Sequence, residues 1–192
     1  MNLLTRIYRY IIRNIRRLFY RSLSTVKISC SSGAPIFMAP VLSEGQGRIF
    51  VGAGTSFGYP EDQDFWNSYV FLNPRAKESE IRFGNHCQIC NHFTAIAEGP
   101  GIEMGNGVLV GSHVAIYDTD FHEISANRRL NGTPKMGKVV IEDNVWIGDR
   151  VTILKGAHIG KNSVVAAGAV VAGKFPDDVV IGGVPARVIR SL

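Results

Sequence analysis

Residues 141–176 read IEDNVW IGDRVT ILKGAH IGKNSV VAAGAV VAGKFP, and an aliphatic residue opens each block of six. A fixed period determines the architecture of a repeat protein, so this repeat is the first feature to interpret. Two columns of the repeat are apolar or small throughout, the opening residues and the residues four positions later: Ile141, Ile147, Ile153, Ile159, Val165 and Val171, then Val145, Val151, Ala157, Ser163, Ala169 and Phe175.

A period of six excludes an α-helix, because about 3.6 residues per turn does not divide six. Short strands separated by corners do give this period. Three blocks then form one triangular coil of about 18 residues, and successive coils stack at the strand spacing of roughly 4.8 Å. We therefore expect an all-β solenoid with the aliphatic columns pointing inward. Gly148 and Gly160 follow opening residues, where a turn has room for little side chain.

Weaker matches extend the register toward the N-terminus, at 51–56, 83–88 and 89–94. Two stretches break it, 58–76 and 117–138, and we expect both to be loops. Long loops in a compact solenoid are more often functional than structural, although a tolerated insertion is the alternative. The expected organisation is a helix over 1–26, a β-helix over 27–176 and a separate C-terminal segment over 177–192.

The composition points to one globular domain. The chain has 192 residues and a net charge of +5. Residues 1–27 hold seven basic residues and no acid, so the remainder is slightly negative. A basic charge confined to one short segment argues against binding to nucleic acid. Three cysteines are too few for a disulfide framework and favour a reducing compartment, which leads us to expect a cytoplasmic protein.

The basic segment itself predicts an amphipathic helix. Its apolar residues recur every three or four positions with arginines between them: Leu4, Ile7, Ile11, Ile15 and Leu18. The apolar runs are too short for a signal peptide or a membrane span. Such a helix suits an anionic membrane surface, which would place residues 1–24 at the inner face of the membrane. A helix that covers the domain or packs at a subunit interface is the open alternative.

Two segments, NVWIGDRVTILKGAHIGKNSVVAAGAVV at 144–171 and PDDVVIGGVPARVIR at 176–190, carry a resemblance to a known family. The chain resembles the hexapeptide-repeat acyltransferases, and most of all the maltose/galactoside acetyltransferases and the bacterial surface-polysaccharide O-acetyltransferases. The resemblance implies a left-handed parallel β-helix, a homotrimer and no metal. It also implies direct transfer of an acetyl group from acetyl-CoA to a sugar hydroxyl.

The stretch DTDFHE at 118–123 lies inside the second gap and contains the expected catalytic residue. His122 matches the family's catalytic histidine, which removes the proton of the attacking hydroxyl. Histidine suits this task because its usual pKa lies near neutral pH. Asp118 or Asp120 is expected to orient the imidazole or only to form a turn. Asn91 matches an asparagine that contacts the acceptor sugar in relatives, with a corner residue as the alternative.

The resemblance places acetyl-CoA in a groove between neighbouring β-helices. The backbone N–H of Asp149, which follows Gly148, would stabilise the negative charge on the thioester oxygen. Trp146 would line the pantetheine tunnel or only pack. The remaining expected contacts are Ala167, Ala172, Gly173, Lys174, Arg187 and Arg190. Relatives often have Thr-Lys where this chain has Ala172-Gly173, with the lysine one place later.

Two other classes of protein use the same repeat. His86 and His92 are six residues apart and are expected to stack on adjacent coils, which suggests the zinc site of γ-class carbonic anhydrases. In that class a further ligand lies five residues after the counterpart of His122, but Asn127 stands there. A non-enzymatic β-helix subunit would need neither the histidine loop nor the C-terminal motif.

The sequence narrows the acceptor only by class. A surface-polysaccharide sugar or its lipid-linked precursor is expected, because the basic helix would hold the enzyme where such precursors are made. A soluble sugar or a xenobiotic is the alternative. Cys87 and Cys90 are not expected to bind a metal, since Cys87 falls in the inward column and Cys90 in a turn.

Overall fold

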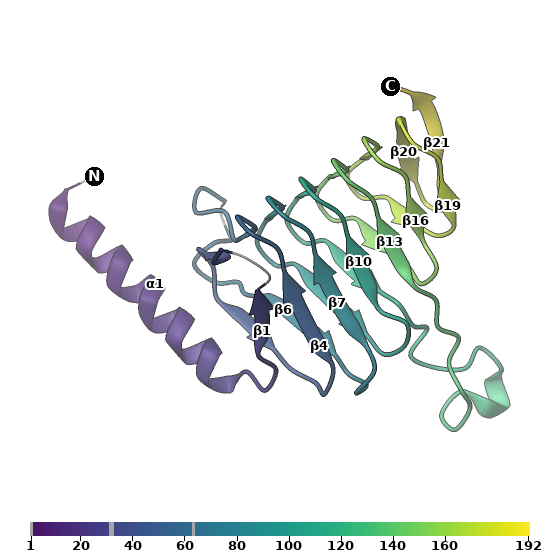
Figure 1. Ribbon diagram of the computed structural model, residues 1–192, viewed down its shortest axis with the longest axis horizontal. Coiled ribbons are helices and arrows are strands. Elements are labelled where there is room, and N and C mark those ends of the chain that lie inside the picture. The colour runs from purple at the N-terminus through teal and green to yellow at the C-terminus, as the bar shows by residue number, and fades with distance from the viewer. Residues whose placement is uncertain (1, 31–32, 63) are drawn as a thin grey trace.

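The structure is a computed structural model that describes residues 2–30, 33–62 and 64–192. One long helix, α1 (Leu3–Leu23), precedes a series of short strands. The strands stack in a row with α1 at one end and the C-terminus at the other (Figure 1). Residue 1 of the predicted helix and residue 63 of the first predicted loop lie outside the described residues.

The strands form three sheets, in which each strand from β1 to β17 pairs with the strand three places later. Sheet A contains β1 (Ile28–Cys30), β4 (Arg48–Val51), β7 (Glu80–Phe83), β10 (Ile102–Met104), β13 (Val139–Ile141), β16 (His158–Ile159) and β19 (Lys174–Phe175). Sheet B contains β2 (Ile36–Phe37), β5 (Ser56–Phe57), β8 (Gln88–Ile89), β11 (Leu109–Val110), β14 (Trp146–Ile147), β17 (Val164–Val165), β20 (Val179–Gly183) and β21 (Ala186–Ser191). Sheet C contains β3 (Val41–Ser43), β6 (Val70–Pro74), β9 (Thr94–Ala97), β12 (Ala115–Tyr117), β15 (Thr152–Ile153) and β18 (Val170–Val171).

Pairing at intervals of three strands makes a three-sided coil, as the six-residue period predicts. The pairs within each sheet are parallel, apart from the last one. β20 pairs parallel with β17 and so continues the coil beyond residue 176. β21 then returns antiparallel to β20.

The inward columns predicted from the repeat form the core. The opening residues from Ile141 to Val171 are at most 1% exposed. The strand register stacks them directly, with Ile141 on Ile159, and Ile153 on Val171. At Gly148, a Cβ atom would lie 2.7 Å from the backbone nitrogen of Ala167 in the next coil, so this corner has no space for a side chain.

The two predicted loops differ in how well they match the structure. The first prediction, 58–76, was wrong at its C-terminal part, because Val70–Pro74 is strand β6 with Val70 and Leu72 fully buried. The periodicity missed this strand because it follows an irregular segment instead of a complete block of six. The second loop lies between Tyr117 and Val139, close to the predicted 117–138, and contains the short 3-10 helix η1 (Ala126–Arg128).

Among the described residues, no helix combines the length and apolar character needed to cross a bilayer.

The stacked core predicts a position-dependent cost of truncation. Ile153→Ala should lower the free energy of unfolding by about 2–5 kcal/mol, because it removes buried methyl groups and leaves a cavity. Ile189→Ala is the matched control, since Ile189 is 62% exposed, and its effect should stay within about 0.5 kcal/mol. Urea denaturation followed by circular dichroism measures both. Equal effects of the two substitutions would contradict the assigned core.

Candidate active site at the corners of the coil

The coil has three rows of corners, named here by the sheets they connect: A/B, B/C and C/A. The loop 58–69 leaves the B/C row between β5 and β6, and the loop 118–138 leaves the C/A row between β12 and β13. The second loop projects away from the coil at the lower right of Figure 1. The two interruptions of the repeat therefore lie on different edges of the molecule.

His122 lies on the projecting loop with an exposed side chain. Its ring atom Nδ1 is 3.3 Å from the carbonyl oxygen of Arg129 in the same loop. A carbonyl oxygen only accepts hydrogen bonds, so Nδ1 carries the proton in this arrangement and Nε2 is left as the basic atom. The imidazole is thus oriented by a backbone group. Sequence reasoning could not find Arg129, because any residue type provides a carbonyl.

Asp118 lies at the start of the projecting loop. Its fully buried carboxylate accepts three backbone N–H bonds, from Glu98 at 2.7 Å, Gly99 at 3.0 Å and Gly101 at 2.8 Å. These donors form the corner of the preceding coil, so Asp118 anchors the start of the projecting loop. Of the two roles left open for Asp118, orienting the imidazole or forming part of the loop turn, these bonds favour the second.

Asp120 is also engaged elsewhere. One of its carboxylate oxygens lies 2.7 Å from Nζ of Lys155, which stands at the next C/A corner. The ion pair ties the loop to the coil on its C-terminal side. With Asp118 and Asp120 both committed to anchoring, the loop holds His122 from a fixed base.

Asn91 lies at a B/C corner and is fully buried. Its Nδ2 donates to the carbonyl of Tyr59 at 3.0 Å, and its Oδ1 accepts from the Tyr59 N–H at 3.1 Å. The amide therefore holds the beginning of the loop 58–69, as expected of a corner residue. Direct contact with an acceptor stays a prediction, and it would require this pair of bonds to open.

The same loop reaches across the B/C row to a polar cluster that the sequence did not reveal. Asp62 accepts a short hydrogen bond from the Ser112 hydroxyl, and the Asp64 carboxylate lies 2.9 Å from Nε2 of His113. The hydrogen bond with His113 lowers the pKa of Asp64. Aspartates distant in sequence thus meet residues of the regular coil, which no spacing rule predicts.

The histidine row expected from the sequence was wrong. His92 stacks on His113, with ring centroids 4.4 Å apart, and not on His86. Six residues advance the chain by one side of the triangle, so His86 and His92 lie in different rows of corners. Glu98, six residues after His92, lies in the third row. Stacked neighbours are one full coil apart, as the pairing of Gln88 with Leu109 shows.

Gly148 and Asp149 occupy a B/C corner, one coil beyond Ser112. The Asp149 carboxylate accepts from the Ser112 N–H at 2.9 Å. Within the part of the chain that the structure describes, the Asp149 N–H itself donates to no acceptor. Donation of this N–H to the thioester oxygen stays a prediction.

The expected coenzyme residues are not gathered on one edge of a single chain. Ala167 lies at the B/C row, whereas Ala172 and Gly173 lie at the C/A row and Lys174 follows in β19. Arg187 and Arg190 lie on β21, and both are exposed. Their role as contacts of one coenzyme molecule stays a prediction.

Trp146 points outward from sheet B and is 55% exposed, so it does not pack in the core of its own chain. Its register partner in the preceding coil, Leu109, is 42% exposed. The two side chains form an apolar strip on an otherwise regular face. Cys87 is buried and Cys90 half-buried; burial raises the pKa of each thiol, which disfavours the thiolate that a metal requires.

The structure thus divides the predicted site between two edges. The B/C row carries Asn91, Gly148, Asp149 and Ala167, and the C/A row carries His122 with Ala172 and Gly173. His122 and Asp149 therefore lie on different edges of the same chain.

Comparisons with known proteins identify the class of protein that this chain resembles. A family model described as Bacterial transferase hexapeptide (six repeats) matches residues 138–173. A galactoside O-acetyltransferase of Lactococcus lactis subsp. lactis (strain IL1403) is 41% identical over 102 residues, which cover 53% of this chain and 49% of the relative. WbbJ of Escherichia coli (strain K12), a candidate lipopolysaccharide biosynthesis O-acetyl transferase, is 33% identical over 119 residues, which cover 58% of this chain and 60% of the relative.

A solved structure is similar over most of the chain. The crystal structure of a hexapeptide-repeat acetyltransferase from Vibrio cholerae O1 biovar eltor, complexed with acetyl coenzyme A, has a TM-score of 0.58 and 28% identity. The match covers 96% of this chain and 82% of that one, whereas the chain spans about half the length of the Lactococcus relative. The chain carries the bacterial transferase hexapeptide repeat and is similar in sequence and fold to hexapeptide-repeat acetyltransferases.

Proposed function

We propose that the protein is an acetyl-CoA-dependent O-acetyltransferase acting on a sugar hydroxyl, with His122 as the general base. The similarity to a galactoside O-acetyltransferase and to an acetyltransferase complexed with acetyl coenzyme A supports the reaction class. The observation that carries the proposal is the geometry of His122. It stands outside the regular coil, on an anchored loop, with Nδ1 facing the Arg129 carbonyl.

The reaction proceeds by direct transfer. Nε2 of His122 removes the proton from the acceptor hydroxyl as its oxygen attacks the thioester carbonyl carbon. The carbonyl oxygen gains negative charge, and the Asp149 N–H donates to it. When the tetrahedral species collapses, the carbon–sulfur bond breaks, the thiol of coenzyme A leaves with the proton held on His122, and the acetyl ester remains on the sugar.

The active site lies between copies of the chain, and the functional unit is a homotrimer of left-handed coils. His122 on the C/A row of one protomer serves the B/C row of its neighbour, which provides Asp149 and Ala167. The exposed Trp146 and Leu109 then lie at the side of the groove and contact the pantetheine arm or the neighbouring coil. In a closed ring of three protomers, each groove is formed by the C/A row of one protomer and the B/C row of the next, so no groove is left incomplete.

The acceptor is a sugar of a surface polysaccharide or its lipid-linked precursor. The resemblance to WbbJ supports this class. The apolar face of α1, described next, also supports this class, because an enzyme held at a membrane surface meets membrane-bound acceptors there.

One face of α1 lies on the coil. The Arg16 guanidinium donates to the carbonyl of Phe65 at 2.9 Å and to that of Ser68, and Tyr20 stacks on Tyr69 with ring centroids 4.8 Å apart. Polar and aromatic residues of the helix therefore contact its own domain.

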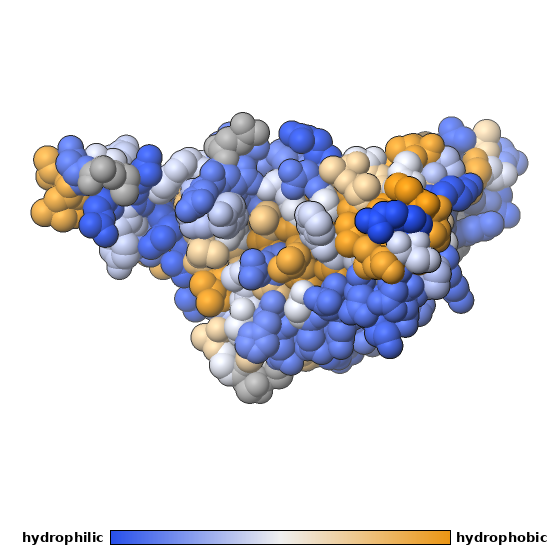
Figure 2. All heavy atoms as spheres, turned by 90° about the horizontal axis from the view of Figure 1, so that it is seen from above, coloured by the Kyte–Doolittle hydropathy of each residue, from blue (hydrophilic) through white to orange (hydrophobic). Residues whose placement is uncertain are grey.

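The opposite face of α1 forms an apolar stripe, called here the outward stripe: Leu4, Ile7, Ile11, Ile15 and Leu18. These side chains are 47–76% exposed. At about 100° per residue, the stripe is centred on the side of the helix opposite Arg16 and Tyr20. Part of this apolar surface is visible at the left of Figure 2. One side of α1 lies on its own domain, and the other side presents aliphatic residues to the surroundings. Such a helix suits peripheral contact with a bilayer.

His122→Ala tests the base. Turnover should fall by roughly 10²–10⁴, the usual contribution of a positioned general base, while circular dichroism stays unchanged because the side chain is exposed. Asn127→Ala, on the same loop, is the control and should retain its turnover. Release of coenzyme A in the presence of a sugar acceptor measures both. A His122→Ala enzyme with near-normal kcat would exclude the assigned role.

Mixed trimers test the shared site. His122→Ala and Ala167→Trp should each be inactive alone, the second because the indole blocks the coenzyme groove. Random assortment of the two chains should restore about a quarter of the sites, since one chain then supplies the intact loop and its neighbour the intact groove. Unfolding and refolding the mixture, followed by the coenzyme A assay, detects the recovery. If the mixture stays inactive although mixed trimers form, the site belongs to a single chain.

Deletion of residues 1–24 tests the membrane contact. The shortened protein should lose binding to anionic vesicles, because the outward stripe and the arginines are removed, and should still acetylate a soluble sugar. Vesicle co-sedimentation and the coenzyme A assay give the two readouts. A shortened chain that no longer folds or assembles would instead make α1 a structural element.

A further inference from the structure

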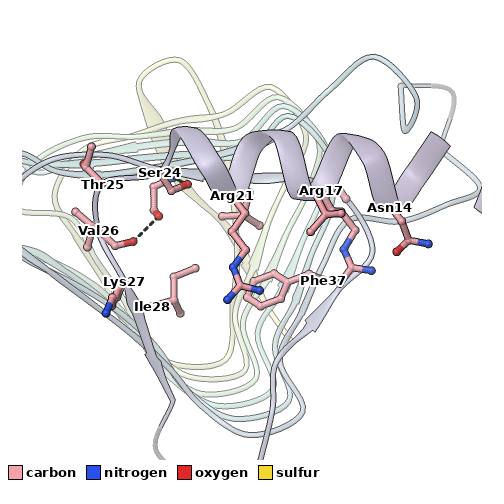
Figure 3. A pocket seen from close by; sticks show the side chains of 13 residues that line it. Asn14, Arg17, Arg21, Ser24, Thr25, Val26, Lys27, Ile28 and Phe37 are labelled. Atoms are coloured by element: carbon pink, nitrogen blue, oxygen red, sulfur yellow. Dashed lines mark hydrogen bonds between the residues drawn. The ribbon is translucent and has the colours of Figure 1, made fainter. Parts of the chain in front are cut away.

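The first coil leaves the end of the core open. β1, β2 and β3 have a neighbouring coil on one side only, whereas the strands from β4 to β17 have a neighbour on both sides. Their inward side chains are accordingly only partly buried: Val26, Ile28, Phe37 and Val41. Figure 3 looks onto this end and shows Ile28 and Phe37 beneath α1. The end of the coil thus presents an apolar floor.

The C-terminal half of α1 forms one wall of a pocket over this floor. The pocket has a volume of about 940 Å³, and its lining includes Arg17, Leu18 and Arg21 of the helix, and Lys27 on the other side. In Figure 3 the Arg17 and Arg21 side chains extend from α1 toward Phe37. No aspartate or glutamate is among the described residues that line it.

The three cations have no carboxylate partner among the described residues. The ion pairs among the described residues involve other side chains. The neighbouring Arg16 donates to the carbonyls of Phe65 and Ser68 and is therefore not free to bind a ligand. Three like charges around one pocket repel one another, and an anion among them replaces repulsion with attraction. The rim therefore favours a ligand with a phosphate group.

The floor and the rim together select the ligand class. A small water-soluble anion leaves the apolar floor exposed, and a neutral lipid leaves the cations unpaired. A molecule with a phosphate at one end and a hydrocarbon chain at the other satisfies both. The volume lies at the upper end of the roughly 300–1,000 Å³ range of ligand pockets, which is sufficient for a headgroup and the upper part of a chain.

The pocket also lies at a suitable depth. Leu18 belongs both to its lining and to the outward stripe, so the pocket opens beside the surface proposed to enter the bilayer. When that stripe lies among acyl chains, Arg17 and Arg21 on its flank lie at the level of the phosphates.

We propose that this pocket binds one anionic phospholipid of the bilayer, with its phosphate at the Arg17 and Arg21 guanidinium groups, Lys27 adding positive charge at the opposite rim, and an acyl chain against Ile28 and Phe37. The inference deepens the proposed membrane contact and rests on it. It adds a specific lipid site to a helix that would otherwise bind any anionic surface, and it closes the open end of the core with a hydrocarbon chain.

A tryptophan on the floor tests the site. Phe37→Trp is introduced into the full chain after Trp66→Phe and Trp146→Phe have removed the native tryptophans. The protein is bound to vesicles of phosphatidylglycerol whose acyl chains carry bromine, which quenches indole fluorescence on contact. The indole should lose most of its fluorescence. Ile36→Trp in the same background is the control, because Ile36 is the neighbouring residue on β2 and is 51% exposed, and it should be quenched much less.

Two further variants separate this site from general membrane binding. The unaltered protein should bind vesicles of phosphatidylglycerol more strongly than vesicles of phosphatidylcholine. Replacing Arg17, Arg21 and Lys27 with glutamine should abolish this preference and the quenching on phosphatidylglycerol, yet leave residual vesicle binding through the outward stripe. Ile7→Ser with Ile11→Ser should reduce binding to both lipids. If Phe37→Trp protein binds vesicles and its indole is not quenched, the lipid site is refuted and the membrane contact stands. A protein that binds no vesicle at all refutes both.

Discussion

Each coil of this molecule is supported by the same contact, an aliphatic side chain stacked on its counterpart in the next coil. Ile147 lies on Val165, and Ile153 on Val171, in parallel register. A close-packed interior of this kind leaves no space for polar groups that lack partners. Side chains that take part in chemistry are therefore confined to the corners and the outward faces. The separation of His122 from Asp149 follows from this constraint, since different corners point in different directions.

The loop 118–138 interrupts the repeat without disrupting the stacked core, because side chains at the base of the loop bond to the neighbouring coils. A loop that leaves a corner removes the turn that would satisfy the backbone of the preceding coil. The buried Asp118 carboxylate replaces that turn by accepting the N–H groups of Glu98, Gly99 and Gly101. The pair of Asp120 with Lys155 adds a tie to the following coil. The loop can therefore project without loosening the core.

Periodicity predicted the strands and the core well where the blocks are complete, because a six-residue repeat has only one compact arrangement. It failed at Val70–Pro74, which enters the coil after an irregular loop. The predicted stacking of His86 on His92 failed because six residues advance the chain by one side of the triangle and not by a full coil, and the stacked neighbour of His92 is His113. The roles of Asp118 and of the Arg129 carbonyl depend on hydrogen bonds to backbone groups, which carry no signature in residue type. The pairing of Asn91 with Tyr59 is of the same kind.

The reversal of the chain at its C-terminus affects how the molecule can be extended. A parallel solenoid ends in a strand with free backbone groups, and such an edge is a template for another chain. In sheet B, β21 covers that edge and runs antiparallel to β20. A second solenoid arriving end-on would meet a strand of the wrong direction, which disfavours fibres built by end-to-end addition.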